Sequence, residues 1–148
     1  NERNQDNTGM LLHNKRIFCV EDNTQNRIIF RILLTENGAT VDFERWGQDA
    51  MFRLKSLPGV DLIILDLMLA HGVSGFDLYD QIRAMPAYAR VPIVAVSAVD
   101  PAVALPQVRE RGFQGFIAKP IDKDLFPAQI AALINGQPVW HTGEALRG

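Results

Sequence analysis

The sequence predicts a doubly wound α/β fold, in which a five-stranded parallel sheet is covered on both faces by five helices. Short apolar runs alternate five times with longer stretches whose apolar residues recur every three or four positions. That alternation is typical of consecutive strand-helix units. The runs at residues 63–65 and 93–96 are almost continuously apolar, as expected for central strands that are buried on both faces.

The strands are predicted at residues 16–20, 40–44, 61–65, 92–96 and 115–118. The second of these alternates apolar and polar residues, which favours a position at the edge of the sheet. An edge position for the second strand agrees with the strand order 2-1-3-4-5, the flavodoxin-like order among doubly wound sheets.

Apolar stripes at helical spacing mark four of the five helices, and we interpret them as faces that pack on the core. The first helix also has Asn23 or Thr24 as a candidate N-cap and Gly38 just beyond its end. The fourth helix, at about residues 102–111, is expected to be short, kinked or late in starting, because Pro106 lacks a backbone donor and crowds the preceding turn. The four stripes are Ile28, Ile29, Ile32 and Leu33; Ala50, Leu54 and Leu57; Tyr79, Ile82 and Met85; and Phe126, Ile130, Leu133 and Ile134.

Length and composition are those of one ordinary domain. The 148 residues are 47% hydrophobic and 22% charged, close to the averages for soluble proteins, and suffice for one core but not for two. No apolar run approaches the roughly 20 residues that span a bilayer, and residues 1–9 lack the apolar segment of a secretory signal. We expect a cytoplasmic domain at residues 14–134, an N-terminal tail at residues 1–13 and a C-terminal tail or linker at residues 135–148.

Charge and cysteine content exclude some partners. Fifteen basic and 17 acidic residues give a net charge of -2, so neither nucleic acid nor a membrane is expected to bind through broad electrostatic attraction. The single cysteine, Cys19, lies within an apolar run. It excludes an internal disulfide, suits a reducing compartment and is interpreted as a buried structural thiol.

Polar side chains follow four of the five predicted strands, at the points where the strands end. Glu21 and Asp22 follow the first strand, Asp66 the third, Ser97 the fourth and Lys119 the fifth. The carboxyl ends of parallel strands meet at one edge of an open sheet, where ligands of such folds bind. We therefore expect three carboxylates, a hydroxyl and an ammonium group to converge in one crevice.

Three carboxylates in one crevice need a positive charge between them. Each close pair repels by about 4 kcal/mol at roughly 4 Å and an effective dielectric near 20. A hard divalent cation relieves this, and Mg²⁺ suits a site made of carboxylates, water and phosphate oxygens. We predict Asp22 and Asp66 as direct ligands and Glu21 as a ligand through water. Lys119 adds a compact charge for a carboxylate or an incoming phosphoryl group.

These segments resemble the response regulator receiver domain, the CheY-like phosphoacceptor domain of two-component signalling. The resemblance covers about residues 15–133, nearly all of the predicted strands and helices. It rests on four segments that occur in the family's order: Val20-Glu21-Asp22-Asn23, Ile64-Leu65-Asp66-Leu67-Met68, Val96-Ser97-Ala98 and Ala118-Lys119-Pro120.

The resemblance implies a phosphorelay function. Asp66 would accept a phosphoryl group from the phosphohistidine of a sensor histidine kinase or phosphotransfer protein. Glu21, Asp22, Asp66 and the backbone carbonyl of Met68 would hold Mg²⁺. The chain would then be no enzyme in the usual sense, because the only reactions that it promotes are its own phosphorylation and dephosphorylation.

The resemblance also implies a switch. Ser97 and Lys119 would bind the phosphoryl oxygens, and the added charge of roughly -1.5 to -2 would draw the Ser97 hydroxyl inward. Phe116, at the position of an aromatic residue that the family couples to this movement, would respond by burial alone. The affected surface would be that of the fourth helix, fifth strand and fifth helix. The Lys119–Pro120 bond is expected to be cis, as is common in the family.

Several questions stay open at this point. The loop at residues 69–75 lacks the proline usual in the family and looks one residue longer, which leaves the lifetime of the phosphoryl group open. Asn26 and Arg27 resemble receivers attached to hybrid histidine kinases, so the chain could be a module of a larger protein. The downstream target and the formation of a homodimer also stay open.

Two other classes of protein fit less well. Phosphatases of the haloacid-dehalogenase type use a second aspartate two residues after the nucleophile, at the end of the first strand. Here Met68 takes that offset, and Asp66 follows the third strand. A flavin-binding module would need a glycine-rich phosphate loop after the first strand, where Glu21 and Asp22 would instead repel a phosphate.

Overall fold

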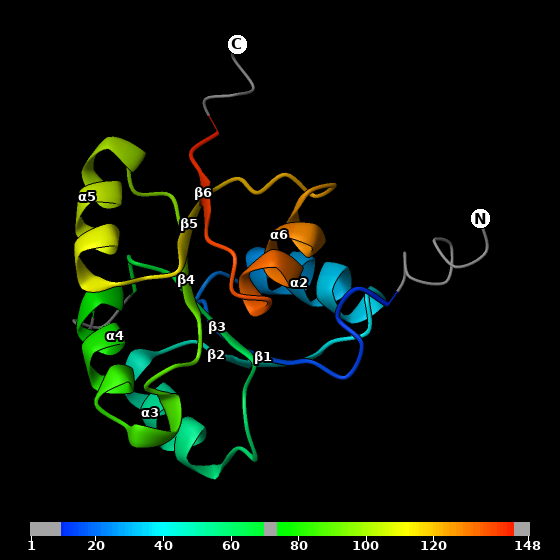
Figure 1. Ribbon diagram of the computed structural model, residues 1–148, viewed down its shortest axis with the longest axis horizontal. Coiled ribbons are helices and arrows are strands. Elements are labelled where there is room, and N and C mark those ends of the chain that lie inside the picture. Colours follow the sequence, from blue (N-terminus) through cyan, green and yellow to red (C-terminus); the bar gives the residue numbers. More distant parts are fainter. Residues whose placement is uncertain (1–9, 70–73, 144–148) are drawn as a thin grey trace.

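A parallel sheet forms the centre of the molecule (Figure 1). The computed structural model describes residues 10–69 and 74–143, and the predictions that concern residues 1–9, 70–73 and 144–148 lie outside this range. Within the described residues the sheet has six strands in the order β2-β1-β3-β4-β5-β6, with every neighbouring pair parallel. The strands are β1 (Arg16–Val20), β2 (Thr40–Glu44), β3 (Leu62–Leu65), β4 (Ile93–Ser97), β5 (Gly115–Ala118) and β6 (Val139–His141).

The predicted order is confirmed for the first five strands, but the predicted number of strands is wrong. The sixth strand, β6, pairs with β5 through the register Gly115↔Val139, Phe116↔Trp140 and Ile117↔His141. It lies within residues 135–148, where a tail or linker was expected. Three residues are too few to show a periodic pattern, so this strand is defined by its pairing partner and not by its own sequence.

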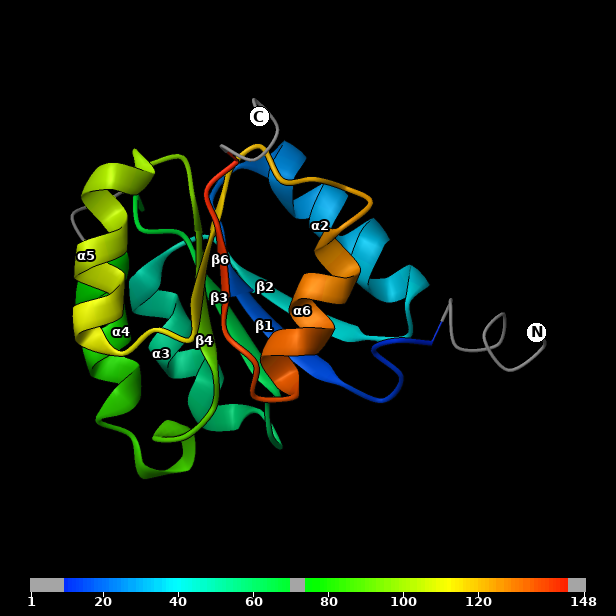
Figure 2. The same cartoon turned by 45° about the horizontal axis from the view of Figure 1, so that its top comes forward.

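Five α-helices among the described residues cover the sheet (Figures 1 and 2). Three of them lie on one face and two, which follow β1 and β5, lie on the other. None of these helices is long and apolar enough to cross a bilayer. The first face carries α3 (Gly47–Ser56), α4 (Gly75–Arg83) and α5 (Pro101–Arg111), and the second carries α2 (Thr24–Glu36) and α6 (Phe126–Ile134); a short 3-10 turn, η1 (Pro86–Tyr88), precedes β4.

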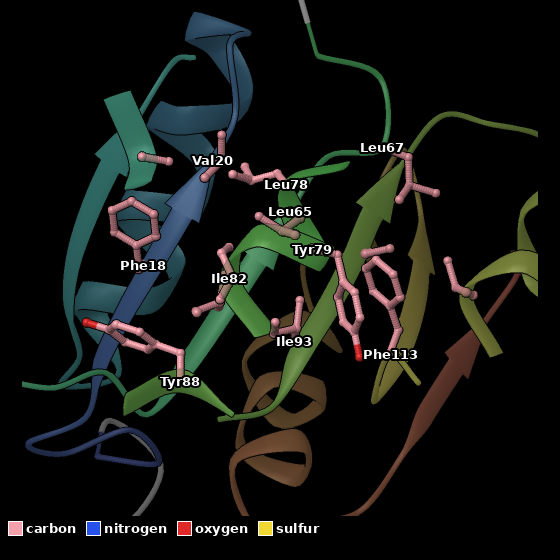
Figure 3. Packing of buried hydrophobic residues seen from close by; sticks show 14 of the residues in the cluster. Phe18, Val20, Leu65, Leu67, Leu78, Tyr79, Ile82, Tyr88, Ile93 and Phe113 are labelled. Atoms are coloured by element: carbon pink, nitrogen blue, oxygen red, sulfur yellow. The ribbon is translucent and has the colours of Figure 1, made fainter. Parts of the chain in front are cut away.

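The central strands supply side chains to two cores, because successive residues of a strand point to opposite faces of the sheet. Phe18 and Val20 face the core beneath α3, α4 and α5 (Figure 3). Ile17 and Cys19 face the core beneath α2 and α6. Cys19 is fully buried, as predicted, and burial raises the pKa of its thiol well above the usual value.

The predicted stripe of α2 is partly wrong. Ile28 and Ile32 are 53% and 48% exposed, whereas Phe30 and Leu34 are buried. The Phe30 ring stacks on Phe126 of α6, with 5.1 Å between the ring centroids. The position of α6 therefore selects the face of α2 that packs. In the other three stripes the buried residues are Ala50, Leu54, Tyr79, Ile82, Phe126, Ile130 and Leu133.

The helix that contains Pro106 is neither short nor late in starting. It runs for 11 residues from Pro101 to Arg111. The Asp100 side chain accepts a hydrogen bond from the Ala102 amide (3.0 Å), and a proline at the first helical position suits a helix start. Gly112, with φ +98°, ends the helix in the left-handed conformation. These strong end signals keep Pro106 within the helix.

The core makes a testable prediction at Tyr88, whose hydroxyl donates to the Leu54 carbonyl of α3 at 2.6 Å. Tyr88→Phe leaves this buried carbonyl without its donor, which we expect to lower the free energy of unfolding by about 1–3 kcal/mol. Urea denaturation measures the loss. The matched control is Tyr79→Phe, because Arg83, which donates to the Tyr79 hydroxyl, also donates to the Tyr88 and Val91 carbonyls. Equal losses in the two variants would contradict the prediction.

Candidate functional site

Four parallel strands bring the predicted site residues together at the carboxyl edge of the sheet. Glu21 follows β1 directly and Asp66 follows β3, while Ser97 is the last residue of β4 and Lys119 follows β5. Glu21, Asp66 and Ser97 are the three buried polar or charged residues among the described part of the chain. Their burial is unusual for such groups, which need partners when they leave water.

Lys119 joins two of the carboxylates. Its Nζ lies 2.6 Å from Oε1 of Glu21 and 2.9 Å from Oδ2 of Asp66. All three side chains are largely buried, so the attraction acts in surroundings that screen charge less than water does. One ammonium group therefore holds the ends of β1, β3 and β5 together.

The second oxygen of Asp66 has its own donors. Oδ1 accepts hydrogen bonds from the Ser97 hydroxyl (3.0 Å) and from the Met68 amide (3.0 Å). In the unphosphorylated chain the Ser97 hydroxyl thus already donates to Asp66, and its movement on phosphorylation stays a prediction. Both oxygens of Asp66 are fixed in direction.

Glu21 is held by the start of α2. The Asn23 amide donates to Oε2 of Glu21 (3.1 Å), and the Asn23 side chain caps the helix by accepting from the Asn26 amide (2.9 Å). The Arg27 guanidinium donates to the Glu21 backbone carbonyl (2.9 Å). From the sequence, Arg27 was recognised only as part of a family pattern, and its contact with Glu21 was not predicted. A basic residue one turn into the helix that follows the acidic pair was the available signal.

Asp22 completes an acidic cluster that suits a cation. One carboxylate oxygen each of Glu21, Asp22 and Asp66 lies within 4.8 Å of the others. An all-oxygen donor set of this kind fits a hard divalent ion. Lys119 takes one oxygen of Glu21 and the Asn23 amide takes the other, which agrees with a role for Glu21 through water. The ligand role of the Met68 carbonyl stays a prediction.

Burial and pairing act in opposite directions on the pKa values of Glu21 and Lys119. Burial raises the pKa of Glu21, and the nearby Lys119 offsets only part of this effect. Burial alone would lower the pKa of Lys119, but hydrogen bonds and charge attraction from Glu21 and Asp66 raise it instead. Lys119 is therefore a firm cation, whereas the charge on Glu21 costs free energy.

Two other predictions concern β5 and the bond that follows Lys119, and the structure can be compared with both. Phe116 lies on β5, fully buried in the core beneath α3, α4 and α5, and its role in a switch stays a prediction. The Lys119–Pro120 peptide bond is cis, as expected. Gly75 starts α4 beneath the site, where a Cβ atom would lie 2.3 Å from the Asp66 carbonyl oxygen. A side chain at that position would displace the backbone that carries Asp66.

Comparison with known proteins identifies this arrangement. The family model described as the response regulator receiver domain matches residues 17–131. The chain belongs to this family. Receiver domains serve the phosphorelays of two-component systems, and the family is one of signalling domains.

Both regulators and sensor kinases occur among the relatives of this receiver domain. The chain is 32% identical over 121 residues to the phosphate regulon transcriptional regulatory protein PhoB of Rhizobium meliloti, covering 81% of this chain and 52% of PhoB. It is 28% identical over 123 residues to the CAI-1 autoinducer sensor kinase/phosphatase CqsS of Vibrio cholerae, covering 82% of this chain but 18% of CqsS. The chain thus spans about half of the regulator and less than a fifth of the kinase.

A solved receiver domain has a similar fold. The receiver domain of the sensor histidine kinase PA1611 from Pseudomonas aeruginosa PAO1 is 27% identical, with a TM-score of 0.70. The match covers 83% of this chain and 99% of the PA1611 receiver. That structure has a magnesium ion coordinated in the active site cleft. A solved structure from Chloroflexus aurantiacus, 23% identical with a TM-score of 0.75, has the same fold.

The site predicts a pH-dependent effect of Lys119→Met. Without metal at neutral pH, this change leaves two buried carboxylates without their cation, and we expect a loss of about 3–5 kcal/mol in the free energy of unfolding. Because the pKa of Glu21 is raised on folding, the folded chain takes up its proton first as the pH falls. The loss in free energy of unfolding caused by Lys119→Met should therefore become smaller as the pH falls from 7 to about 4.5. Urea denaturation in a buffer that contains a chelator measures it. A loss that is independent of pH would contradict this electrostatic account.

Proposed function

We propose that Asp66 is the phosphoacceptor of this receiver domain. One observation carries the proposal: Asp66 is a buried carboxylate at the carboxyl edge of the sheet whose two oxygens are bound by Lys119, Ser97 and the Met68 amide. Donors that converge on a carboxylate can also bind the oxygens of a phosphoryl group attached to it. Ser97 and Lys119 come from the ends of β4 and β5, so donors from two other strands meet at the carboxylate that follows β3.

The reaction is a direct transfer from a phosphohistidine. A carboxylate oxygen of Asp66 forms a bond to phosphorus, the bond between phosphorus and the imidazole nitrogen breaks, and that nitrogen keeps the electron pair. Because Asp66 enters as an anion paired with Lys119, no general base is needed. If the other ring nitrogen of the histidine carries a proton, the imidazole leaves as a neutral group. Otherwise the imidazole takes up a proton from water.

Lys119 and Ser97 position and stabilise the phosphoryl group. Phosphoryl transfer has a loose transition state with its charge spread over three oxygens, so positioning and positive charge supply most of the catalysis. Lys119 offers a firm positive charge at 2.9 Å from Asp66, and Ser97 offers a hydroxyl donor at 3.0 Å. In the phosphorylated chain both groups would turn from Asp66 to the new oxygens.

Magnesium is the proposed cofactor. Asp22 and Asp66 would hold the ion directly, Glu21 would act through water, and the Met68 carbonyl would add an oxygen. The cluster of carboxylates and the magnesium ion in the PA1611 receiver support this assignment. When bound, the ion neutralises charge on the carboxylates and on the transferred group.

The partner would be a sensor histidine kinase or a phosphotransfer protein, because the chemistry needs a phosphohistidine donor. The relatives include a regulator, PhoB, and a sensor kinase, CqsS. This chain could therefore belong to a regulator or be a module of a hybrid kinase. A cytoplasmic location and a role without turnover of an external substrate stay predictions. In the proposed switch, Ser97 and Phe116 change the surface formed by α5, β5 and α6.

Phosphorylation at Asp66 can be tested with acetyl phosphate and magnesium chloride. We expect intact-protein mass spectrometry to show the gain of one phosphoryl group, which a chelator prevents. Asp66→Asn should show no gain because the nucleophilic oxygen is lost. The matched control is Asp124→Asn, an exposed aspartate in the loop before α6, which should be phosphorylated normally. A gain of equal size in Asp66→Asn would refute the assignment.

The metal site can be tested by thermal unfolding with and without magnesium. A ligand that binds only the folded chain stabilises it, so the midpoint should rise with magnesium concentration. Asp22→Asn should raise the midpoint in a chelator by reducing carboxylate repulsion, and should weaken magnesium binding at least about tenfold, or about 1.4 kcal/mol. Asp124→Asn should respond like the unchanged chain. The same magnesium response in Asp22→Asn would exclude Asp22 as a ligand.

A further inference from the structure

We propose that β6 is an intramolecular ligand of the switch surface, and that its docking on β5 and the phosphorylation of Asp66 favour each other. The inference rests on the proposed function, because it needs a phosphoryl group on Asp66. It assigns a regulatory role to residues 139–141, which follow the last helix of the receiver and lie against β5 (Figures 1 and 2).

The edge of β5 is shaped to accept this strand. Gly115 pairs with Val139, and a Cβ atom on Gly115 would lie only 2.4 Å from the Val139 carbonyl oxygen. A glycine is therefore required at this position for the close approach of β6. The pairing also occupies backbone groups that an open edge would offer to another chain. A second copy cannot pair with β5 while β6 is docked.

Trp140 places β6 in contact with the proposed switch residue. Trp140 and Phe116 occupy the same register position on neighbouring parallel strands, so their side chains point to the same face of the sheet. Trp140 packs against the core cluster that contains Phe116. The Arg109 guanidinium of α5 lies over the Trp140 ring, 4.2 Å from its centroid, in a cation–π contact.

The other contact of Trp140 leads back to the phosphorylation site. Arg109 belongs to α5, whose cap is Asp100. Between Ser97 and Asp100, the Val99 amide donates to the Ser97 hydroxyl oxygen (3.4 Å), and that hydroxyl donates to Asp66 (3.0 Å). Trp140 thus contacts Arg109 of the helix after Ser97 and packs against the cluster that contains Phe116, so it touches both parts of the proposed switch surface.

These contacts set the direction of the coupling. The structure combines three features: a Ser97 hydroxyl turned to Asp66, a fully buried Phe116 and a docked β6. Because Trp140 packs against the cluster that contains Phe116, docking of β6 adds to the packing that keeps Phe116 buried. Docked β6 therefore favours the inward arrangement, which is also the one that binds a phosphoryl group. Coupling between two sites is reciprocal, so phosphorylation should tighten β6.

Hydrogen exchange of the full chain tests this inference, with magnesium and beryllofluoride as the phosphoryl mimic. We expect the mimic to slow exchange in the segment at residues 66–69 and to slow exchange of the β6 amides at least about fivefold, the lower end of typical couplings. Asp66→Asn should abolish both effects. Protection at residues 66–69 with unchanged or faster exchange in β6 overturns the inference alone. No protection at residues 66–69 refutes the proposed function as well.

The reciprocal measurement uses the affinity of the full chain for beryllofluoride. Trp140→Ala should weaken binding by the same factor by which the mimic slows β6 exchange, although Trp140 does not contact the site. Arg109→Gln removes the cation–π contact but no core side chain, and it should also lower the affinity for beryllofluoride. Trp46→Phe, at the other tryptophan of the chain, is the control and should leave the affinity unchanged. Unchanged affinity in Trp140→Ala, with the fold intact by circular dichroism, overturns the coupling.

Discussion

The ammonium group of Lys119 between two buried carboxylates is the interaction on which the rest of the structure depends. Glu21 and Asp66 could not both stay charged at the edge of the sheet without a cation, and Lys119 lies 2.6 Å and 2.9 Å from them. The same contact ties the ends of three strands together. Stability and the proposed phosphoryl chemistry therefore depend on one set of charges, so a substitution among these three residues should affect both.

Parallel pairing explains how distant parts of the chain supply this set. All strands of an open parallel sheet end at the same edge. Residues that follow four different strands therefore lie together in space although they are far apart in the sequence. The cores beneath the two helical layers hold the strands in place, and the groups of the site lie at the edge where the strands end. A rigid sheet with a charged edge suits a domain that must accept a phosphoryl group and transmit its presence.

The sequence predicted the sheet order and the positions of the site residues because strong local patterns mark both. Buried strands such as residues 63–65 are continuous apolar runs, and polar residues follow them directly. Features that depend on a partner elsewhere in the fold could not be predicted. Ile28 resembles a core residue until the position of α6 is known. The three residues of β6 show no pattern of their own, and the only related signal is Gly115 of β5, which leaves room for them.

A crystal structure of the full chain with magnesium and beryllofluoride tests the central claim most directly. The account predicts the mimic on a carboxylate oxygen of Asp66, with Lys119 Nζ and Ser97 Oγ both within hydrogen-bonding distance of its fluorine atoms and the metal ion beside Asp22. A mimic bound to another carboxylate, or a Lys119 side chain turned away from the bound group, would contradict it.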